Sequence, residues 1–571
     1  MKLNTDIKIL FLGLLLILVK LFFAEIDLPD FDLAYYSTID ELYYTEFSFD
    51  FSEYGKLHPN EKVNTFTFSL ILNAVTYFTI ELFGDNFIGL RLSSIIFSMA
   101  ALALFWNILR QLIKDVYVKF FAILFLGLNL NYTYASLVVE PTISRLFSML
   151  LIINIVLYVR KKNIPLTMLN SFIITLPIAI LIYFSYPSNI FTYLGLFFSL
   201  CFLQLEKTKQ INLKTITTLL LKNGSIFILS ALTTLTLTYL FFKHFYNIDT
   251  LESTSLLSKG YSNRVGYNFK IFARNIFNIT RANLFIINPL LLCSFLISLV
   301  YLGFNRKKMD SKLIVCLLFF FAFILQTIAV NDFPGRKLII IIPFVILVVA
   351  FAIDNSSLLS YKTKPTKLIK FSIVLALIVP VLSNYIYFRG YNLWDHVGLL
   401  IFGVSALYLG FIFLKHQALS KNSILFLVAC LFLPEIILSQ NYLISEQRFN
   451  YKNTMESLSK YDGQNFYGGF SKGFRMYNEI KTSVNPYLYY GKKDQYYNKI
   501  DSLAKSNQPI DYIIDYGLTD SENKQEIYEK IGFIVHDTLM TAEQTIHIYD
   551  ILLYKEQEVE PSSTKQTIET F

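Results

Sequence analysis

The recurrence of apolar runs close to twenty residues long constrains this chain more than any other feature of its sequence. A run of that length matches the helix that crosses the hydrocarbon core of a bilayer. Of the 571 residues, 54% are hydrophobic and 16% are charged, whereas soluble proteins carry about 25% charged residues. The pattern predicts an α-helical polytopic membrane protein with roughly thirteen transmembrane helices. The candidate spans lie at about 7–24, 88–110, 117–138, 142–159, 165–183, 189–205, 215–242, 284–304, 312–330, 337–354, 369–388, 396–414 and 422–440.

The lysines and arginines predict how these helices are oriented. They gather in alternate connections between the spans, for example at Arg160–Lys162 and Arg306–Lys308. Positively charged loops stay in the cytoplasm, so the N-terminus is expected inside and the C-terminus outside. The same rule accounts for the formal charge of +8 without a nucleic-acid partner. The richness in Lys, Asn, Ile, Phe and Tyr is typical of AT-rich bacteria, which favours the bacterial cytoplasmic (inner) membrane.

The run 64–83 is diluted by polar residues such as Asn64, Asn73 and Glu81. We predict that it lies along the outer membrane surface as an interfacial helix. If it crossed the membrane, residues 24–63, with ten acidic residues and two lysines, would lie inside. We therefore expect a transmembrane domain of residues 1–440, in which residues 24–87 form the first extracytoplasmic loop.

Beyond residue 440 the hydropathy falls and the pattern becomes that of a small soluble domain. Strands are predicted at 511–516, 532–537 and 546–554, and helices at 452–460 and 520–530. Alternating strand and helix signals predict an extracytoplasmic α/β domain over residues 441–557. The polar tail 558–571 is predicted to be disordered.

An acidic pair in the first predicted loop is the leading candidate for chemistry. Asp40 and Glu41 lie among tyrosines that include Tyr44, close to the expected membrane interface. Aromatic neighbours exclude water, and a partly desolvated carboxylate is a stronger base. The alternative is that both acids are simply solvated.

Three segments in order give the chain its resemblance to a known family. They are Asp40-Glu41, then His58-Pro59, then 82-LFGDNFIGLRLSS-94. This order resembles the GT-C class of polytopic membrane glycosyltransferases, in particular the branch of protein O-mannosyltransferases and lipid A aminoarabinose transferases. The resemblance covers residues 7–160 best, and Asn60 stands where that branch has a second proline. It implies that Asp40 is the catalytic base and that the donor is a sugar on a polyprenyl phosphate.

The implied reaction needs positive charge beside the departing phosphate. A phosphate leaves as an anion, so one general base can suffice, and a single displacement inverts the anomeric centre; a glycosidase, by contrast, needs a paired acid. Arg336 and Lys337 lie at the outer mouth of a predicted span, in the segment 331-NDFPGRKLIIIIPF-344. This segment resembles the family's Arg-Tyr…Pro entry into a helix, with Lys337 where tyrosine is usual. Further donors of positive charge lie in the predicted outer loop 243–283. The phosphate-binding candidates are Arg336, Lys337, Arg264, Arg274 and Arg281. A snorkelling arginine and a solvated loop are the alternatives.

Four further residues, Tyr44, His58, Glu140 and Arg145, are predicted to position the acceptor or the donor. Glu140 precedes Pro141 at the start of a predicted span, and Arg145 follows within it. The family often has an acid and an arginine there, and an arginine in the hydrocarbon needs a partner such as Glu140 or Asp40. Helix capping explains Glu140 equally well. His58 is either a substrate contact or an ordinary loop histidine.

No metal site or cofactor is predicted, although a divalent metal is not excluded. The DxD at Asp30–Asp32 is too short to argue for one, and the four cysteines have no metal spacing. The predicted partners are the bilayer, a polyprenyl-phosphate sugar and an acceptor lipid, glycan or protein. Two alternatives stay open. They are a transporter or flippase of lipid-linked saccharides, and a non-catalytic envelope assembly protein.

Overall fold

The structure is a computed structural model. It describes residues 5–26, 48, 69–185, 190–208, 212–246, 288–304, 309–329, 339–355, 432–433, 435–436, 450–468, 476–484, 511–517, 533–544 and 547–556. A helical segment occupies each of the first ten predicted spans, whereas the last three spans lie almost wholly outside the described residues. These helices are α1 (Thr5–Leu18) with the 3₁₀ turn Val19–Phe23, α5 (Phe87–Leu112), α6 (Val116–Leu128), α7 (Leu130–Leu137), α8 (Pro141–Lys161), α9 (Met168–Ser185), α10 (Ile190–Glu206), α11 (Leu213–Tyr246), α15 (Pro289–Phe304), α16 (Ser311–Ala329) and α17 (Ile342–Asp354).

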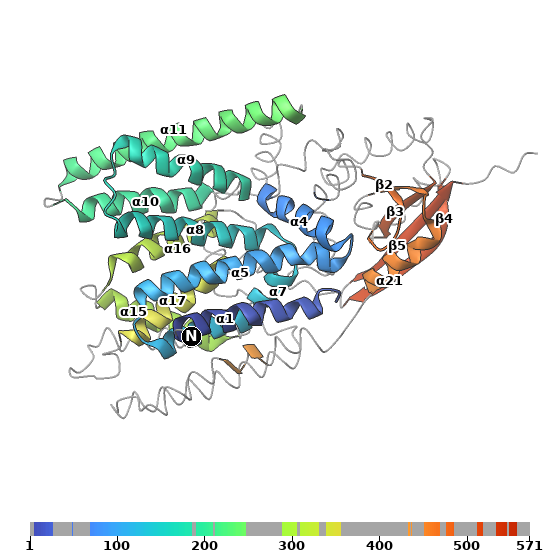
Figure 1. The fold of residues 1–571 in the computed structure, drawn as a ribbon, viewed down its shortest axis with the longest axis horizontal. Helices are drawn as coiled ribbons and strands as arrows, with labels where there is room; N and C mark the ends of the chain where they lie inside the picture. Colours follow the sequence, from blue (N-terminus) through green and yellow to red (C-terminus); the bar gives the residue numbers. More distant parts are fainter. Residues whose placement is uncertain are drawn as a thin grey trace, which may run out of the picture.

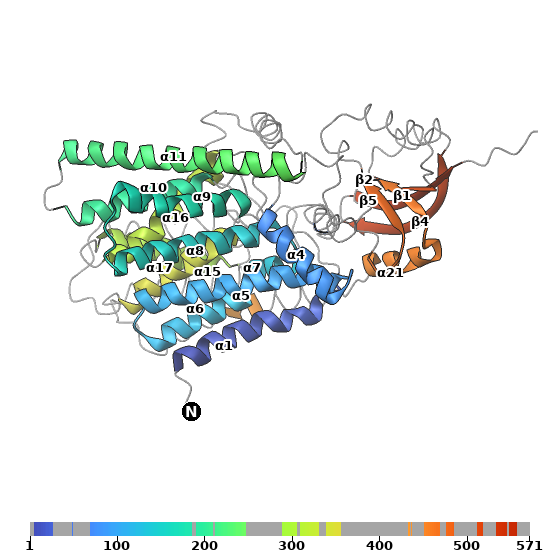
Figure 2. The same cartoon turned by 45° about the horizontal axis from the view of Figure 1, so that its top comes forward.

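The helices lie side by side in one bundle, and a separate sheet domain lies beyond one end of it (Figure 1, Figure 2). Helix α1 runs from the N-terminus toward this domain, and α5 runs back beside it. Among the described residues, four helices are long and apolar enough to span a membrane, or five if the bent pair α6 and α7 counts as one. The protein is therefore a polytopic membrane protein. The total of thirteen spans stays a prediction.

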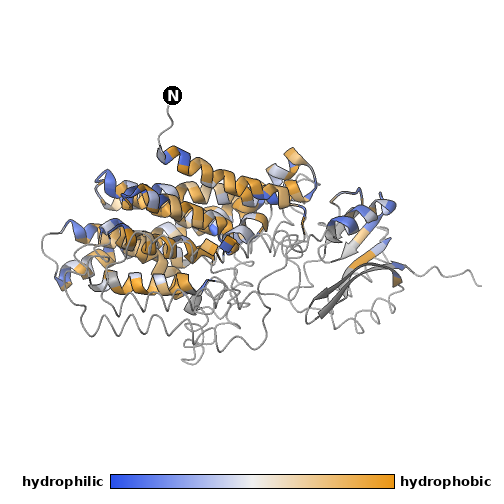
Figure 3. Ribbon diagram, turned by 90° about the horizontal axis from the view of Figure 1, so that it is seen from below, coloured by the Kyte–Doolittle hydropathy of each residue, from blue (hydrophilic) through white to orange (hydrophobic). Residues whose placement is uncertain are grey.

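The helices of the bundle are mostly hydrophobic (Figure 3), with large apolar side chains exposed and small polar side chains buried. Phe22 is 87% exposed, and Leu221 and Phe245 are exposed as well, whereas Ser93 and Ser148 are fully buried. Lipid tails leave no hydrophobic force between helices, so small residues that allow close approach and hydrogen bonds hold the helices together. This distribution agrees with a bilayer as the solvent of the helical part.

The predicted span 117–138 is not one straight helix. It is broken at Asn129 into α6 and α7, which meet at an angle of 56°. The Asn129 side chain caps α7 by accepting the N–H of Tyr132, and the buried Glu435 carboxylate accepts the N–H of Leu130 at 3.0 Å. The first N–H groups of a helix have no intrahelical partner, so these two oxygens stabilise a helix start within the bundle.

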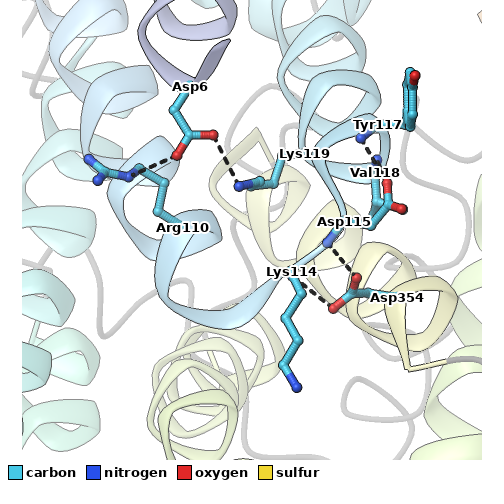
Figure 4. Close-up of polar contacts among 8 residues, drawn as sticks. All are labelled: Asp6, Arg110, Lys114, Asp115, Tyr117, Val118, Lys119 and Asp354. Carbon is cyan, nitrogen blue, oxygen red and sulfur yellow. Dashed lines mark hydrogen bonds and ion pairs between the residues drawn. The ribbon is translucent and has the colours of Figure 1, made fainter. Parts of the chain in front are cut away.

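The end of the bundle away from the sheet domain is joined by charged contacts (Figure 4). Asp6 of α1 lies between Lys119 and Arg110, at 3.1 and 3.6 Å. The Asp354 carboxylate, at the end of α17, accepts the backbone N–H groups of Lys114 and Asp115 at 2.9 and 2.8 Å. These contacts tie α1 and α17 to the turn between α5 and α6, where the sequence predicts the cytoplasmic side.

The C-terminal domain contains a five-stranded mixed sheet beside helix α21 (Asn450–Ser457). Its order is β2-β1-β3-β5-β4; β1 is parallel to β2 and β3, and β5 is antiparallel to β3 and β4. The three predicted strands are present, but β1 and β2 were not predicted because four residues carry too little periodicity. Helix 520–530 and the tail lie outside the described residues. The strands are β1 (Asn465–Gly468), β2 (Lys481–Val484), β3 (Tyr512–Gly517), β4 (Phe533–Gln544) and β5 (His547–Glu556).

The segment predicted to lie at the interface forms helix α4 (Leu70–Phe83), which packs mainly on α5. Its buried face carries Asn73 and Thr76 beside Leu72 and Ile80. Its exposed face carries Phe78 and Leu82 beside Glu81. Polar residues are thus buried and large apolar ones exposed, unlike on a surface helix of a water-soluble protein. This arrangement suits a helix with lipid on one side and the polar interior of the bundle on the other. The orientation of α4 in the membrane stays a prediction.

Candidate active site

Two of the predicted site residues belong to the described part of the chain, namely Glu140 and Arg145. Both lie at the start of α8, and each is only 4% exposed. The other predicted residues lie outside the described residues, so their roles stay predictions. They are Asp40, Glu41, Tyr44, His58, Arg264, Arg274, Arg281, Arg336 and Lys337.

Glu140 occupies the N-cap position of α8, but its side chain does not cap the helix. Its backbone is extended, and its carboxylate accepts no backbone N–H of α8. The oxygens instead accept hydrogen bonds from the hydroxyls of Tyr134 and Thr142, each at 3.4 Å. Pro141 at the first helical position explains the helix start without the acid. The side chain of Glu140 therefore does not act as the N-cap of α8.

Arg145 lies one and a half turns further along α8 and points toward α16. Its Nη2 donates to Oε1 of Gln326 at 3.4 Å, and its guanidinium lies 5.9 Å from the centre of the Phe323 ring. Among the described residues no ion pair joins Arg145 to Glu140, although the sequence offered Glu140 as a partner. The start of α8 thus carries a buried carboxylate and a buried guanidinium.

A chain of hydroxyl and amide groups connects this helix start to the first predicted loop. The hydroxyl of Ser144, next to Arg145, donates a hydrogen bond to the hydroxyl oxygen of Ser69 at 2.9 Å. Asn73, one turn along α4, donates its amide to the carbonyl oxygen of Ser69. The hydroxyl of Ser48 in turn donates to the carbonyl and amide oxygens of Asn73, both at 2.9 Å.

Ser48 is fully buried, and it is the described residue closest in sequence to Asp40 on its C-terminal side. Its contacts link Ser48, through Asn73 and Ser69, to the helix that carries Glu140 and Arg145.

The arginine of the 82–94 segment has a position that the sequence did not predict. Arg91 is fully buried on α5, and its Nη1 donates to the carbonyl oxygens of Ala24 and Ile26 at 2.9 and 2.6 Å. The guanidinium also lies 4.9 Å from the centre of the Phe87 ring. Carbonyl groups that end a helix need such donors, so Arg91 fixes the point where the first loop leaves the bundle. The sequence signal that could have indicated a buried, paired arginine was a charged residue within an apolar helix.

No family model matches the sequence, and no curated protein matches it. The fold does match solved structures. The structure of ArnT from Cupriavidus metallidurans bound to undecaprenyl phosphate covers 95% of this chain and 97% of ArnT, with a TM-score of 0.52 and 13% sequence identity. This chain has the GT-C fold. The structure of ArnT from Cupriavidus metallidurans without ligand gives the same coverage, with a TM-score of 0.50 and 13% identity.

The match confirms the resemblance that the three sequence segments indicated, because ArnT is a lipid A aminoarabinose transferase of the GT-C class. It extends over the helical part and the C-terminal domain, whereas the sequence segments cover mainly the first 160 residues. An identity of 13% supports the fold and leaves the substrates open.

Proposed function

We propose that this protein is an integral membrane glycosyltransferase. It moves a sugar from a polyprenyl-phosphate donor to a hydroxyl group of a lipid, glycan or protein at the extracytoplasmic face. The observation that carries the proposal is the buried start of α8, where a carboxylate, Glu140, and a guanidinium, Arg145, lie on one helix of a GT-C fold. The fold that this chain shares with ArnT bound to undecaprenyl phosphate supports a lipid-phosphate donor.

The chemistry assigns one role to the acids and another to the basic residues. Asp40, with Glu41 beside it, takes the proton of the acceptor hydroxyl as that oxygen attacks the anomeric carbon. The sugar–phosphate bond breaks on the opposite side, and the polyprenyl phosphate leaves with the electron pair, so the configuration inverts. No acid is needed for this leaving group. Tyr44 and His58 position the acceptor.

Positive charge near the departing phosphate stabilises the transition state because the charge on the leaving oxygen grows as the bond breaks. Arg336 and Lys337, with Arg264, Arg274 and Arg281, are the proposed phosphate ligands. Arg145 is suited to an anionic or hydroxyl-rich group at the site, since its guanidinium lies in a buried setting where charge-assisted hydrogen bonds are strong. Glu140 is suited to accept hydrogen bonds from sugar hydroxyls. The proposal includes no metal and no cofactor.

The test is transfer from a panel of radiolabelled polyprenyl-phosphate sugars by the full chain in proteoliposomes. Asp40→Asn should abolish transfer, because an amide cannot accept the proton. Asp32→Asn is the matched control, since it removes a carboxylate and the DxD pair from the same acidic segment, and it should retain activity. Undiminished transfer by Asp40→Asn would refute the base assignment. Activity lost in Asp32→Asn but not in Asp40→Asn would favour metal-dependent chemistry.

One observation favours a second candidate, a flippase of lipid-linked saccharides. Helices broken within the membrane are typical of transporters, and α6 and α7 form such a pair. One proteoliposome preparation can distinguish the two functions. A transferase changes the mass of the acceptor, whereas a flippase only moves the labelled lipid between leaflets. Mass spectrometry of envelope glycans and lipids from a deletion strain would then identify the sugar that is missing.

A further inference from the structure

A tyrosine side chain of the C-terminal domain binds the helical bundle. The hydroxyl of Tyr477, which precedes β2, accepts the backbone N–H of Phe87 at 3.1 Å and donates to the Glu25 carboxylate at 3.3 Å. The backbone N–H of Tyr477 donates to the carbonyl oxygen of Asp85 at 3.2 Å. Phe87 is the first residue of α5, where an N–H has no intrahelical acceptor. Tyr477 therefore caps a helix of the bundle from another domain.

A second side chain of the C-terminal domain completes the contact. The Nζ of Lys452, on α21, lies 2.8 Å from the other carboxylate oxygen of Glu25 and 5.5 Å from the centre of the Tyr477 ring. Glu25 thus binds Tyr477 through one oxygen and Lys452 through the other. We call these three residues, Glu25, Lys452 and Tyr477, the latch. Burial raises the pKa of the Tyr477 hydroxyl above its ordinary value, so the hydroxyl stays protonated and available as a donor.

The backbone of Tyr477 indicates that this position is held by its surroundings. Its φ angle is +65°. A bulky residue is rarely found in this left-handed region, and it stays there only where neighbouring contacts impose the conformation. At Tyr477 such contacts are made by its backbone N–H with Asp85 and by its hydroxyl with Phe87 and Glu25.

The latch acts at the start of the first loop, on residues 24–26. Arg91 binds the carbonyl oxygens of Ala24 and Ile26 from within the bundle, and the latch binds the side chain of Glu25 from outside it. Residues 24–26 are therefore held from two sides. The next residues begin segment 27–68, which contains the proposed base Asp40.

We propose that the C-terminal domain is a positioning element of the active site. Through the latch it fixes residues 24–26, from which the chain continues in sequence to the proposed base Asp40. The proposal rests on the proposed function for its catalytic consequence. Because the latch acts on the stretch of chain that leads to the proposed base, it should govern turnover and not donor binding.

Two measurements on the full-length protein test the proposal. The first is hydrogen–deuterium exchange in wild type and Tyr477→Phe. The Phe87 amide depends on the Tyr477 hydroxyl for its hydrogen bond, so its exchange should speed up at least tenfold, together with that of residues 24–26. The second is steady-state transfer in proteoliposomes. Loss of one or two positioning hydrogen bonds predicts a kcat about tenfold lower with the donor KM within twofold of wild type.

Lys452→Met provides a second variant with the same expected direction, in case Tyr477→Phe does not fold. Tyr461→Phe is the matched control, because it removes a tyrosine hydroxyl from the same domain where the ring packs on Phe466 and Tyr512. It should change neither measurement.

Each measurement can contradict a different part of the proposal. Unchanged exchange at Phe87 and residues 24–26 in both latch variants would overturn the latch itself. Faster exchange with an unchanged kcat, or a rise in donor KM that accounts for the whole loss, would overturn the positioning role. Wild-type protein that is inactive with every donor would instead remove the proposed function, while the exchange data would still decide whether the domain fixes the start of the first loop.

Discussion

Replacing Arg91 should destabilise the protein more than replacing any exposed arginine of the same helix. Arg91→Met keeps most of the side-chain length but removes both hydrogen bonds to the carbonyl oxygens of Ala24 and Ile26. A hydrogen bond to a charged group contributes about 1.5–3 kcal/mol. Removing the buried charge also relieves its desolvation cost, which reduces the net effect. We therefore expect a loss of about 2–4 kcal/mol.

The measurement is thermal unfolding in detergent, followed by intrinsic fluorescence. The apparent melting temperature of Arg91→Met should fall by several degrees. Arg110→Gln is the matched control, because Arg110 lies at the other end of α5, is 53% exposed and stands 3.6 Å from Asp6. Exposed ion pairs contribute roughly 0–1 kcal/mol, so this variant should melt within about one degree of wild type. Equal melting temperatures for the two variants would refute the structural role of Arg91.

Three further predictions concern buried or paired carboxylates. Glu140→Gln should lower transfer at least tenfold while the protein still folds, because the amide keeps the volume and loses the charge; an unchanged kcat/KM would remove Glu140 from the site. Glu435→Ala should lower the apparent melting temperature, since a buried N–H at the start of α7 loses its acceptor at a cost of about 1–3 kcal/mol; equal stability would show that water replaces it. Glu206 lies just beyond a predicted span, and the hydrogen bond from Arg160 holds its pKa below the ordinary 4.5. The stability from this pair is present above pH 4.5 and is lost as the pH falls through the lower pKa of the folded state, so Glu206→Gln should flatten the dependence of melting temperature on pH below about 4.5.

The helices were predictable from the sequence because the bilayer imposes one simple requirement on them. A run of about twenty apolar residues satisfies it, and a helical segment occupies each of the first ten predicted spans. The break at Asn129 was not predictable in this way. Hydropathy does not change there, and the helix ends because the side chains of Asn129 and Glu435 satisfy a new helix start. Glu435 is about three hundred residues away in the sequence.

The candidate site was predictable only in part, and for a similar reason. Glu140 and Arg145 could be proposed from local sequence, and the structure shows that both are buried. What local sequence could not decide was whether Glu140 caps α8, since capping depends on where the side chain points. The contacts of Arg91 and Tyr477 connect residues far apart in the chain. No periodicity or motif reports such contacts before the chain is folded.

The apolar exterior of the bundle bears on how such proteins diverge. A lipid-facing position such as Phe22 or Leu221 needs only a hydrophobic side chain. Leucine, isoleucine, valine and phenylalanine can therefore replace one another there with little loss of stability. Interior sites such as Ser93 and Ser148 have far less freedom, because an extra methylene would push two helices apart. Most residues can therefore be substituted during evolution while the fold is retained. A chain of this kind can share 13% of its residues with ArnT and still superimpose along nearly its whole length.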